Sequence, residues 1–163
     1  MRVAQPGERI VVGEVAMTVL APASVARAVT DAGNPESSAE NNASVVTVAQ
    51  VGGLRILLPG DAEPEEQQPL VGPALEVDVL KLPHHGSAHQ DPAFIAATHA
   101  RIAVASAGLR NDYGHPAPRT LALVQQLGMR IVRTDQQGSL AFARDGPEIV
   151  ILTQRSCVRA GCG

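Results

Sequence analysis

Two apolar runs, each ending in residues that can bind a metal ion, constrain this chain more than any other feature. Residues 57–61 read Leu-Leu-Pro-Gly-Asp, and residues 80–87 read Leu-Lys-Leu-Pro-His-His-Gly-Ser. Short apolar runs bounded by turn residues predict buried strands. Asp61, His84 and His85 are therefore expected just beyond strand ends, where a rigid sheet can aim them into a cleft. A catalytic zinc ion takes three protein ligands, so these two motifs predict only part of a metal site.

Length and composition agree with a globular chain. Its 163 residues fit a single domain or a fragment of one, and only 2% of them are aromatic, which predicts an aliphatic core. The net charge is −3 and no basic run stands out as a nucleic-acid footprint. No apolar stretch approaches the roughly 20 residues of a membrane span, and no signal peptide is visible. Cys157 and Cys162 lie in a predicted loose tail, 154–163, as free thiols or one small disulfide.

Turn and strand patterns predict an α/β chain with a mixed β-sheet and helices. Hairpins are expected at 9–20 and 45–58, around Gly13-Glu14 and Gly52-Gly53. The middle of the chain alternates between strands and helices. Its predicted strands are 77–82 and 102–105. One predicted helix begins at Glu63, and two others span 92–97 and 118–127. Two closing hairpins are expected, one at 131–143 and one turning at Asp145-Gly146.

The candidate ligands also have structural interpretations. Asp61 could cap a helix that begins at Glu63, because Asp is a favoured cap. Two adjacent histidines after a strand are less easily explained as structural than one. Neighbouring side chains of an extended backbone point to opposite faces, so one of the pair is expected to bind metal, and His84 is favoured over His85. His115, in a turn-rich loop before a helix, is expected either to contact phosphate or only to order its loop.

Other kinds of catalytic site find less support. Ser87, His85 and Asp61 have the residue types of a nucleophilic triad, but the chain has no Gly-x-Ser-x-Gly elbow. It also has no Gly-rich loop followed by Lys-Ser or Lys-Thr, which argues against an NTPase. His89 is expected at the surface. His99 follows a predicted helix, where a cation suits the helix dipole without any further function.

Four stretches, taken in order, resemble the metallo-β-lactamase-like domain of the ComEC family of DNA-internalisation competence proteins. They are residues 42–46, 57–63, 80–87 and 111–116, and residues 133–140 resemble that family's closing hairpin. The resemblance covers about 41–143. It implies the C-terminal half of an αββα sandwich, so that the chain would be a fragment or a single domain spanning 1–163.

The resemblance also implies site residues. The superfamily commonly holds two divalent metal ions, zinc or manganese, with Asp61 as the bridging carboxylate and one histidine of the pair His84-His85 as the last ligand, His84 being favoured. His85, Ser87 and His115 would orient the phosphate or protonate the leaving group. The family pattern begins with a His-x-His-x-Asp-His motif, and no histidine precedes His84 here. The chain alone is therefore expected to be inactive and not to retain the metals.

The implied role is metal-assisted cleavage of DNA during uptake by a membrane channel. The parent protein would lie in the bacterial cell membrane, with this part on the extracytoplasmic side. Expected partners are DNA, the missing N-terminal half of the domain, the parent's channel and, through an uncovered sheet face, another copy of the chain. Two alternatives stay open: a hydrolase of a small phosphodiester or ester, and a non-catalytic module that binds a partner.

Overall fold

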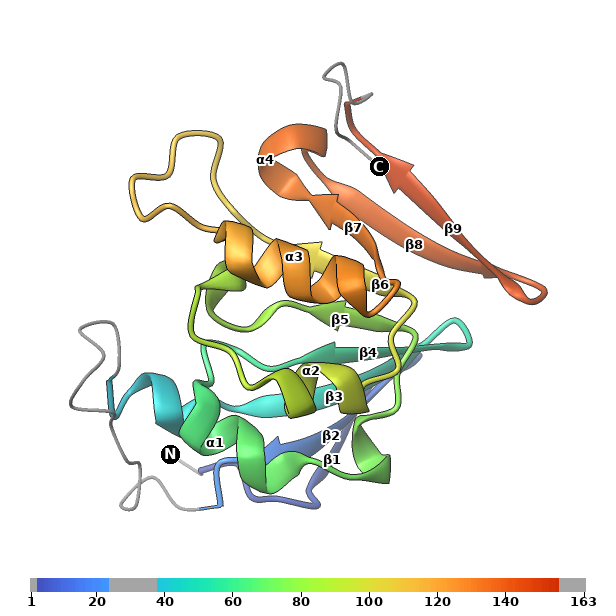
Figure 1. The fold of residues 1–163 in the computed structure, drawn as a ribbon. Helices are drawn as coiled ribbons and strands as arrows, with labels where there is room; N and C mark the ends of the chain where they lie inside the picture. Colours follow the sequence, from blue (N-terminus) through green and yellow to red (C-terminus); the bar gives the residue numbers. More distant parts are fainter. Residues whose placement is uncertain (1–2, 24–37, 156–163) are drawn as a thin grey trace.

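A seven-stranded mixed sheet forms the centre of the computed structural model, which describes residues 3–23 and 38–155 (Figure 1). The strands lie in chain order. Neighbours from the first to the fourth strand are antiparallel, and neighbours from the fourth to the seventh are parallel. Their bounds are β1 (Arg9–Val12), β2 (Val15–Ala21), β3 (Val46–Val51), β4 (Leu54–Leu58), β5 (Val79–Lys81), β6 (Ile102–Ala105) and β7 (Arg130–Arg133).

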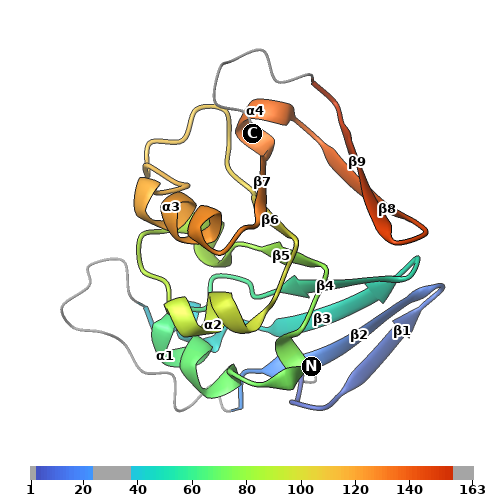
Figure 2. The ribbon, with the colours of Figure 1, turned by 45° about the vertical axis from the view of Figure 1, so that its right-hand side comes forward.

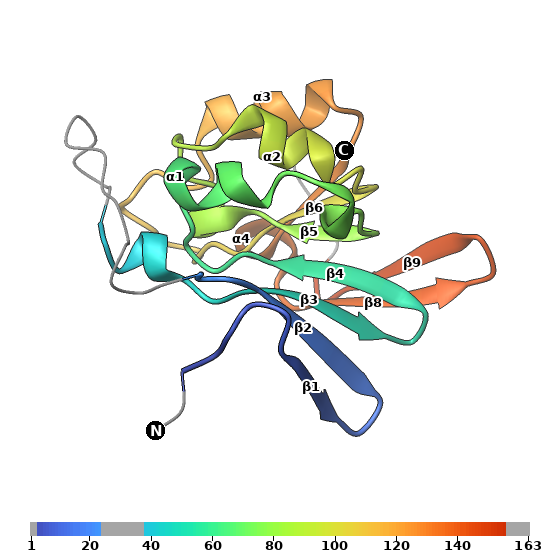
Figure 3. The same cartoon turned by 90° about the horizontal axis from the view of Figure 1, so that it is seen from below.

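Three helices cover one face of this sheet, and a separate two-stranded hairpin lies on the other side (Figure 3). The helices are α1 (Pro64–Gln67), α2 (Pro92–Ala97) and α3 (Pro118–Gln126), and the hairpin strands are β8 (Leu140–Asp145) and β9 (Glu148–Thr153). A single helical turn, α4 (Thr134–Gln137), joins β7 to β8 (Figure 2). The 3-10 turns are η2 (Asn41–Ala43), η3 (Gln68–Leu70), η4 (Pro73–Leu75) and η5 (Pro83–Gly86). No helix in the described residues has the length and hydropathy to cross a membrane.

Two apolar clusters hold these layers together. The larger lies between the sheet and the helices, and its fully buried members include Leu57, Leu80, Phe94, Ile95 and Val124. The smaller lies between the sheet and the hairpin, where Val79, Ile102 and Val132 meet Leu140, Phe142, Ile149 and Ile151. The strands β5 and β6 are thus covered on both faces, as expected for parallel strands in the middle of a sheet.

A charged contact fastens the hairpin to the sheet. The Arg144 guanidinium donates to the Asp78 carboxylate and, through Nε, to the Gly53 carbonyl at 2.9 Å. The backbone N–H of Arg55 donates to Asp78 at 2.8 Å. Burial raises the pKa of Asp78, but the hydrogen bonds from Arg144 and Arg55 and the nearby arginine charges outweigh it, so the pKa lies below its ordinary value.

The hairpin does not cover the whole sheet. The sheet residues that pack against it come from β4, β5, β6 and β7. On β1, at the sheet edge, Val11 and Val12 are 60% and 64% exposed. An exposed apolar edge strand can pair with another chain. Self-association therefore remains a prediction for this chain.

Most of the predicted elements are present. Both early hairpins are confirmed, and Asp91 caps α2 by accepting from the Phe94 N–H at 2.8 Å. The predicted hairpin at 131–143 is wrong, because β7 pairs with β6 and β8 pairs with β9. Between them the chain makes the helical turn α4. The Arg133 guanidinium, paired with Asp135 at 2.7 Å, stabilises that turn.

The predicted tail falls mostly outside the described residues, and Cys157 and Cys162 lie there. Its first two residues continue the β8–β9 region. The N–H groups of Gln154 and Arg155 donate to the Ser139 and Gln137 carbonyls, both at 2.9 Å. These two residues are therefore not loose, contrary to the sequence prediction.

Candidate metal centre

The candidate ligands lie at the carboxyl ends of two neighbouring parallel strands. The pairing of Ile56 with Val79 and of Leu57 with Leu80 aligns β4 with β5, so both strands end at the same edge of the sheet. Asp61 follows β4 and η5 follows β5. The N–H of His84 donates to the Gly60 carbonyl at 3.1 Å and ties the two loops together. The two motifs therefore converge, as the sequence predicts.

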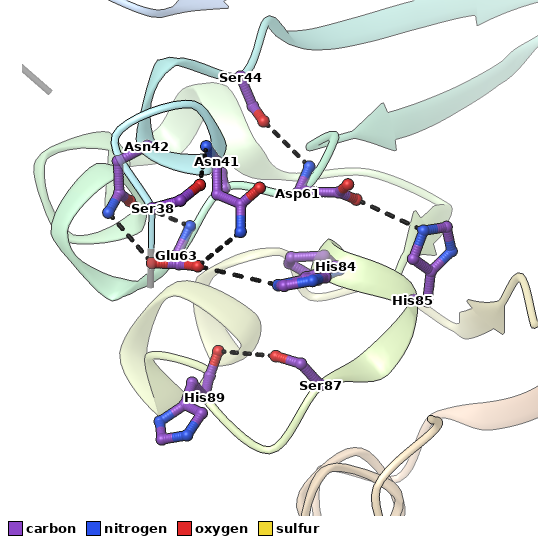
Figure 4. A network of polar contacts seen from close by, with 12 residues as sticks. Ser38, Asn41, Asn42, Ser44, Asp61, Glu63, His84, His85, Ser87 and His89 are labelled. Carbon is purple, nitrogen blue, oxygen red and sulfur yellow. Dashed lines mark hydrogen bonds and ion pairs between the residues drawn. The ribbon is translucent and has the colours of Figure 1, made fainter. Parts of the chain in front are cut away.

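Gly60 and the hydroxyl of Ser44 fix the position of Asp61. Gly60 has φ +60°, and a Cβ there would lie 3.0 Å from the Cβ of Ser44. The Asp61 N–H donates to the Ser44 hydroxyl at 3.1 Å (Figure 4). Asp61 does not cap α1, because Glu63 occupies the N-cap position and no side chain makes a cap bond there. The interpretation of Asp61 as a helix cap is therefore wrong.

The two histidines occupy a strained, left-handed turn. His84 has φ 44° and ψ 50°, and His85 has φ 54° and ψ 15°. The sequence predicts an extended backbone here, and that prediction is wrong. Residues with a side chain rarely adopt such angles, and the strain often marks a functional site. The turn directs the two rings to different neighbours: His84 toward Glu63, and His85 toward Asp61 (Figure 4).

A hydrogen bond orients the His85 ring toward Asp61. Its Nδ1 donates to the Ser106 carbonyl at 2.7 Å. A carbonyl can only accept, so Nδ1 carries the proton and, in the neutral ring, Nε2 keeps a free lone pair. Metal-binding histidines usually hold their other nitrogen in this way. Nε2 lies 3.8 Å from Asp61 Oδ1. The Nε2 lone pair and the Asp61 carboxylate thus face each other, and a cation between them would accept electron pairs from both.

A partly buried cation lies beside Asp61. The Lys81 ammonium donates to the Leu82 carbonyl at 3.1 Å and to the Gly60 carbonyl at 3.4 Å. Burial lowers the pKa of Lys81 below its ordinary value, and the Asp61 charge opposes that shift only in part. The Lys81 side chain thus lies at the same edge of the sheet as the Asp61 carboxylate.

His84 lies near a buried carboxylate that is not among the predicted site residues. Glu63 is 1% exposed, and its Oε1 lies 3.9 Å from His84 Nδ1. Asn41 and Asn42 donate to the same carboxylate at 2.8 and 3.2 Å (Figure 4). A buried carboxylate needs such partners. Glu63 gave no signal in the sequence, because an acid before Pro64 is ordinary at a helix start.

The loop that carries His115 also reaches this edge. The ring centroids of His115 and His84 are 5.5 Å apart. Gly86 permits the approach, since a Cβ there would lie 2.9 Å from the Cβ of Pro116. The Ala117 N–H donates to the Gly86 carbonyl at 2.8 Å. Three histidines predicted as site residues are thus neighbours, although His115 lies about thirty residues further along the chain.

Ser87 lies in a different environment. Its side chain is fully buried, and its hydroxyl donates to the His89 carbonyl at 3.4 Å and accepts from Gln90 at 3.3 Å. The Thr120 hydroxyl donates to the Ser87 carbonyl. These contacts join η5 to α3. They favour a structural place for Ser87 and give no support to a triad with His85.

The remaining histidines lie away from the ligand pair. His99 follows α2 in a left-handed conformation with φ 48° and is exposed, whereas His89 is half-buried rather than fully at the surface. Within the described residues, no group of three or more His, Cys, Asp or Glu side chains is arranged to hold a metal ion. The donors present, a carboxylate and an oriented imidazole, fit zinc or manganese in kind. They would form part of such a site.

Backbone strain at His85 predicts an unusual mutational result. His85→Ala and His85→Gly both remove the ring, but only glycine adopts a positive φ at little cost. In the presence of a chelator, His85→Gly is expected to be more stable than His85→Ala by about 0.5–1 kcal/mol, measured by urea unfolding. At His89, which is not among the positive-φ residues, the order should reverse. Equal stability of the two His85 variants would refute the strain.

Comparison with known proteins gives two significant relatives. The chain is 37% identical over 111 residues to ComE operon protein 3 of Bacillus subtilis (strain 168), a match covering 66% of this chain and 14% of that protein. It is 36% identical over 107 residues to Competence protein ComA of Neisseria gonorrhoeae, a match covering 63% of this chain and 16% of that protein. No protein-family model matches the chain. The matches support a relationship to competence proteins, and the chain spans only a small part of either relative.

Proposed function

We propose that this chain supplies part of the active site of a metal-dependent phosphodiesterase, the nuclease domain of a ComEC-type DNA-uptake protein. The observation that carries the proposal is the meeting of Asp61 and His85, 3.8 Å apart, at the ends of two parallel strands. The strained turn at His84 and His85 supports it, because such strain is retained where the site needs it. The names of the two relatives support the DNA-uptake context.

The proposal gives each residue a role. Asp61 would help to hold both metal ions, and His85 would help to hold one of them. This exchanges the roles that the sequence analysis gave to His84 and His85, because His85 is the histidine whose ring faces Asp61. When bound, two divalent ions lower the pKa of a water molecule and neutralise charge on a phosphodiester. The remaining ligands would come from an N-terminal half of the domain.

The other two histidines would act on the substrate. His84 and His115 lie beside the Asp61–His85 pair, with ring centroids 5.5 Å apart. Ring N–H groups at this place would donate to the oxygens of a bound phosphate. The buried Glu63 carboxylate, near His84 Nδ1, would orient the His84 ring. Ser87 has no role in this proposal, because its hydroxyl is buried.

The wider context is also part of the proposal. The parent protein would lie in the bacterial cell membrane, with this domain on the extracytoplasmic side, where it would cleave one DNA strand beside the uptake channel. Zinc and manganese remain the expected metals. The chain alone would be inactive, since its described residues bring fewer ligands together than a catalytic zinc ion takes.

The test uses the complete domain of the parent protein, with the residues upstream of this chain restored. That domain, loaded with manganese or zinc, is expected to cleave single- or double-stranded DNA and to lose the activity in a chelator. Cleavage of a small phosphodiester or ester with no activity on either form of DNA would move the function to a small-molecule hydrolase. Inactivity on every substrate would favour a module that only binds a partner.

A further inference from the structure

A pocket beside His85 extends away from the metal chemistry proposed above, which uses only His85 and His115 of its lining. Its volume is about 270 Å³. It opens between the η5 turn and the loop that joins β6 to α3, which projects from the sheet edge (Figure 1). The lining residues are His85, Ser106, Ala107, Gly108, Asn111, Tyr113 and His115. None of them is a lysine or an arginine, so the pocket suits a neutral planar group better than a phosphate.

Tyr113 is the chain's only tyrosine, and it is exposed. It is 84% accessible, so most of the ring surface is open to a ligand. The ring lies nearly parallel to His115, with centroids 6.4 Å apart and an interplanar angle of 17°. Local hydrogen bonds hold the loop: the Tyr113 N–H donates to Asn111 Oδ1 at 3.1 Å, and the Asn111 amide donates to the His115 carbonyl. These bonds order the backbone of the loop that carries Tyr113.

The same loop presents a cation and an apolar side chain. Arg110 is exposed, and Leu109 is 69% accessible. An aromatic ring for stacking and a nearby basic residue for the backbone are the two elements of single-strand nucleic-acid binding sites. In a duplex the base faces are already stacked on each other, so an unpaired base is needed to cover a tyrosine ring.

We propose that this pocket and Tyr113 form a subsite that stacks one base of a single-stranded nucleic acid, while Arg110 contacts the strand's phosphates. The inference rests on the proposed function. His85 lines the pocket, so a base bound there would lie next to the phosphate that is cleaved. It adds a preference for an unpaired strand. It also assigns a substrate contact to a residue that lies outside the metal centre.

The experiment measures binding without metal. The 163-residue chain, in a chelator, is titrated with a short thymidine oligonucleotide and with an abasic oligonucleotide of equal length, and backbone amide shifts are followed by NMR. The thymidine strand is expected to bind more tightly. Tyr113→Ala should weaken its binding about tenfold and leave abasic binding unchanged, whereas Tyr113→Phe should retain the preference. Arg110→Ala should weaken both strands alike and reduce the salt slope by about one.

The outcomes separate this inference from the proposed function. Equal affinity for the two strands, or an unchanged thymidine affinity in Tyr113→Ala, would overturn the base subsite whatever the complete domain hydrolyses. A Tyr113-dependent preference for thymidine supports the subsite even if the complete domain cleaves no phosphodiester. Because Tyr113 is so exposed, the alanine variant should keep the fold, and its unperturbed amide spectrum is the control.

Discussion

Replacing Asp61 by alanine in the complete, metal-loaded domain is expected to lower turnover on DNA by about 10³-fold or more. Loss of a residue that only orients a metal ligand already costs 10–100-fold. Asp61 would contact both ions directly, so its removal should disturb both. The hydrogen bond to the Ser44 hydroxyl would be kept, because the Asp61 backbone N–H donates it and the side chain takes no part. The fold should therefore survive the change.

The matched control for Asp61→Ala is Asp145→Ala. Asp145 is an exposed aspartate at the end of β8, outside the candidate centre. It carries the same charge, so its removal separates a general electrostatic effect from the loss of a ligand. Turnover of Asp145→Ala is expected to equal that of the parent domain. If Asp61→Ala also retained normal turnover, Asp61 would not be a ligand.

The second large effect concerns metal binding by the isolated chain. A structural zinc site contributes roughly 10–16 kcal/mol of apparent binding free energy. A chain that offers about half of the ligands should lose several of these kcal/mol, so its zinc affinity should be at least about 10³-fold below that of the complete domain. The comparison is made by calorimetric titration with zinc and with manganese.

The titration needs one precaution. Thiolates bind zinc strongly, and the chain carries Cys157 and Cys162. Both proteins are therefore compared with these cysteines replaced by serine. Nanomolar, stoichiometric zinc binding by the isolated chain, abolished by Asp61→Ala, would show that the chain holds a complete site without an upstream half.

The sequence predicted the strand ends but not the orientation of the rings. Apolar runs and turn residues located β4 and β5, and parallel pairing then brought Asp61 and the histidine pair to one edge. The direction of each ring depends on the left-handed turn at His84 and His85. Histidine has no strong preference for such angles, so no local pattern announces them. Tertiary contacts, such as the His84–Gly60 hydrogen bond, impose the turn.

Long-range polar contacts were likewise outside the reach of sequence patterns. Glu63, Asn41 and Asn42 are ordinary residues of a helix start and a polar loop, and only the folded chain brings their side chains together. The error at 131–143 has a similar cause. The turn residues there suggested a hairpin, but β7 found its partner in β6, and the hydrogen bonds between Thr134 and Ala107 helped to fix the connection as a helical turn.

The metal content of the complete domain tests the central claim most directly. Domains carrying His84→Ala or His85→Ala are prepared in parallel and their bound zinc and manganese are measured by elemental mass spectrometry. The facing of His85 Nε2 and Asp61 predicts that His85→Ala loses at least one of the two ions. His84→Ala should keep both, because its ring contacts Glu63 instead. Full metal content in His85→Ala, with loss in His84→Ala, would contradict the account.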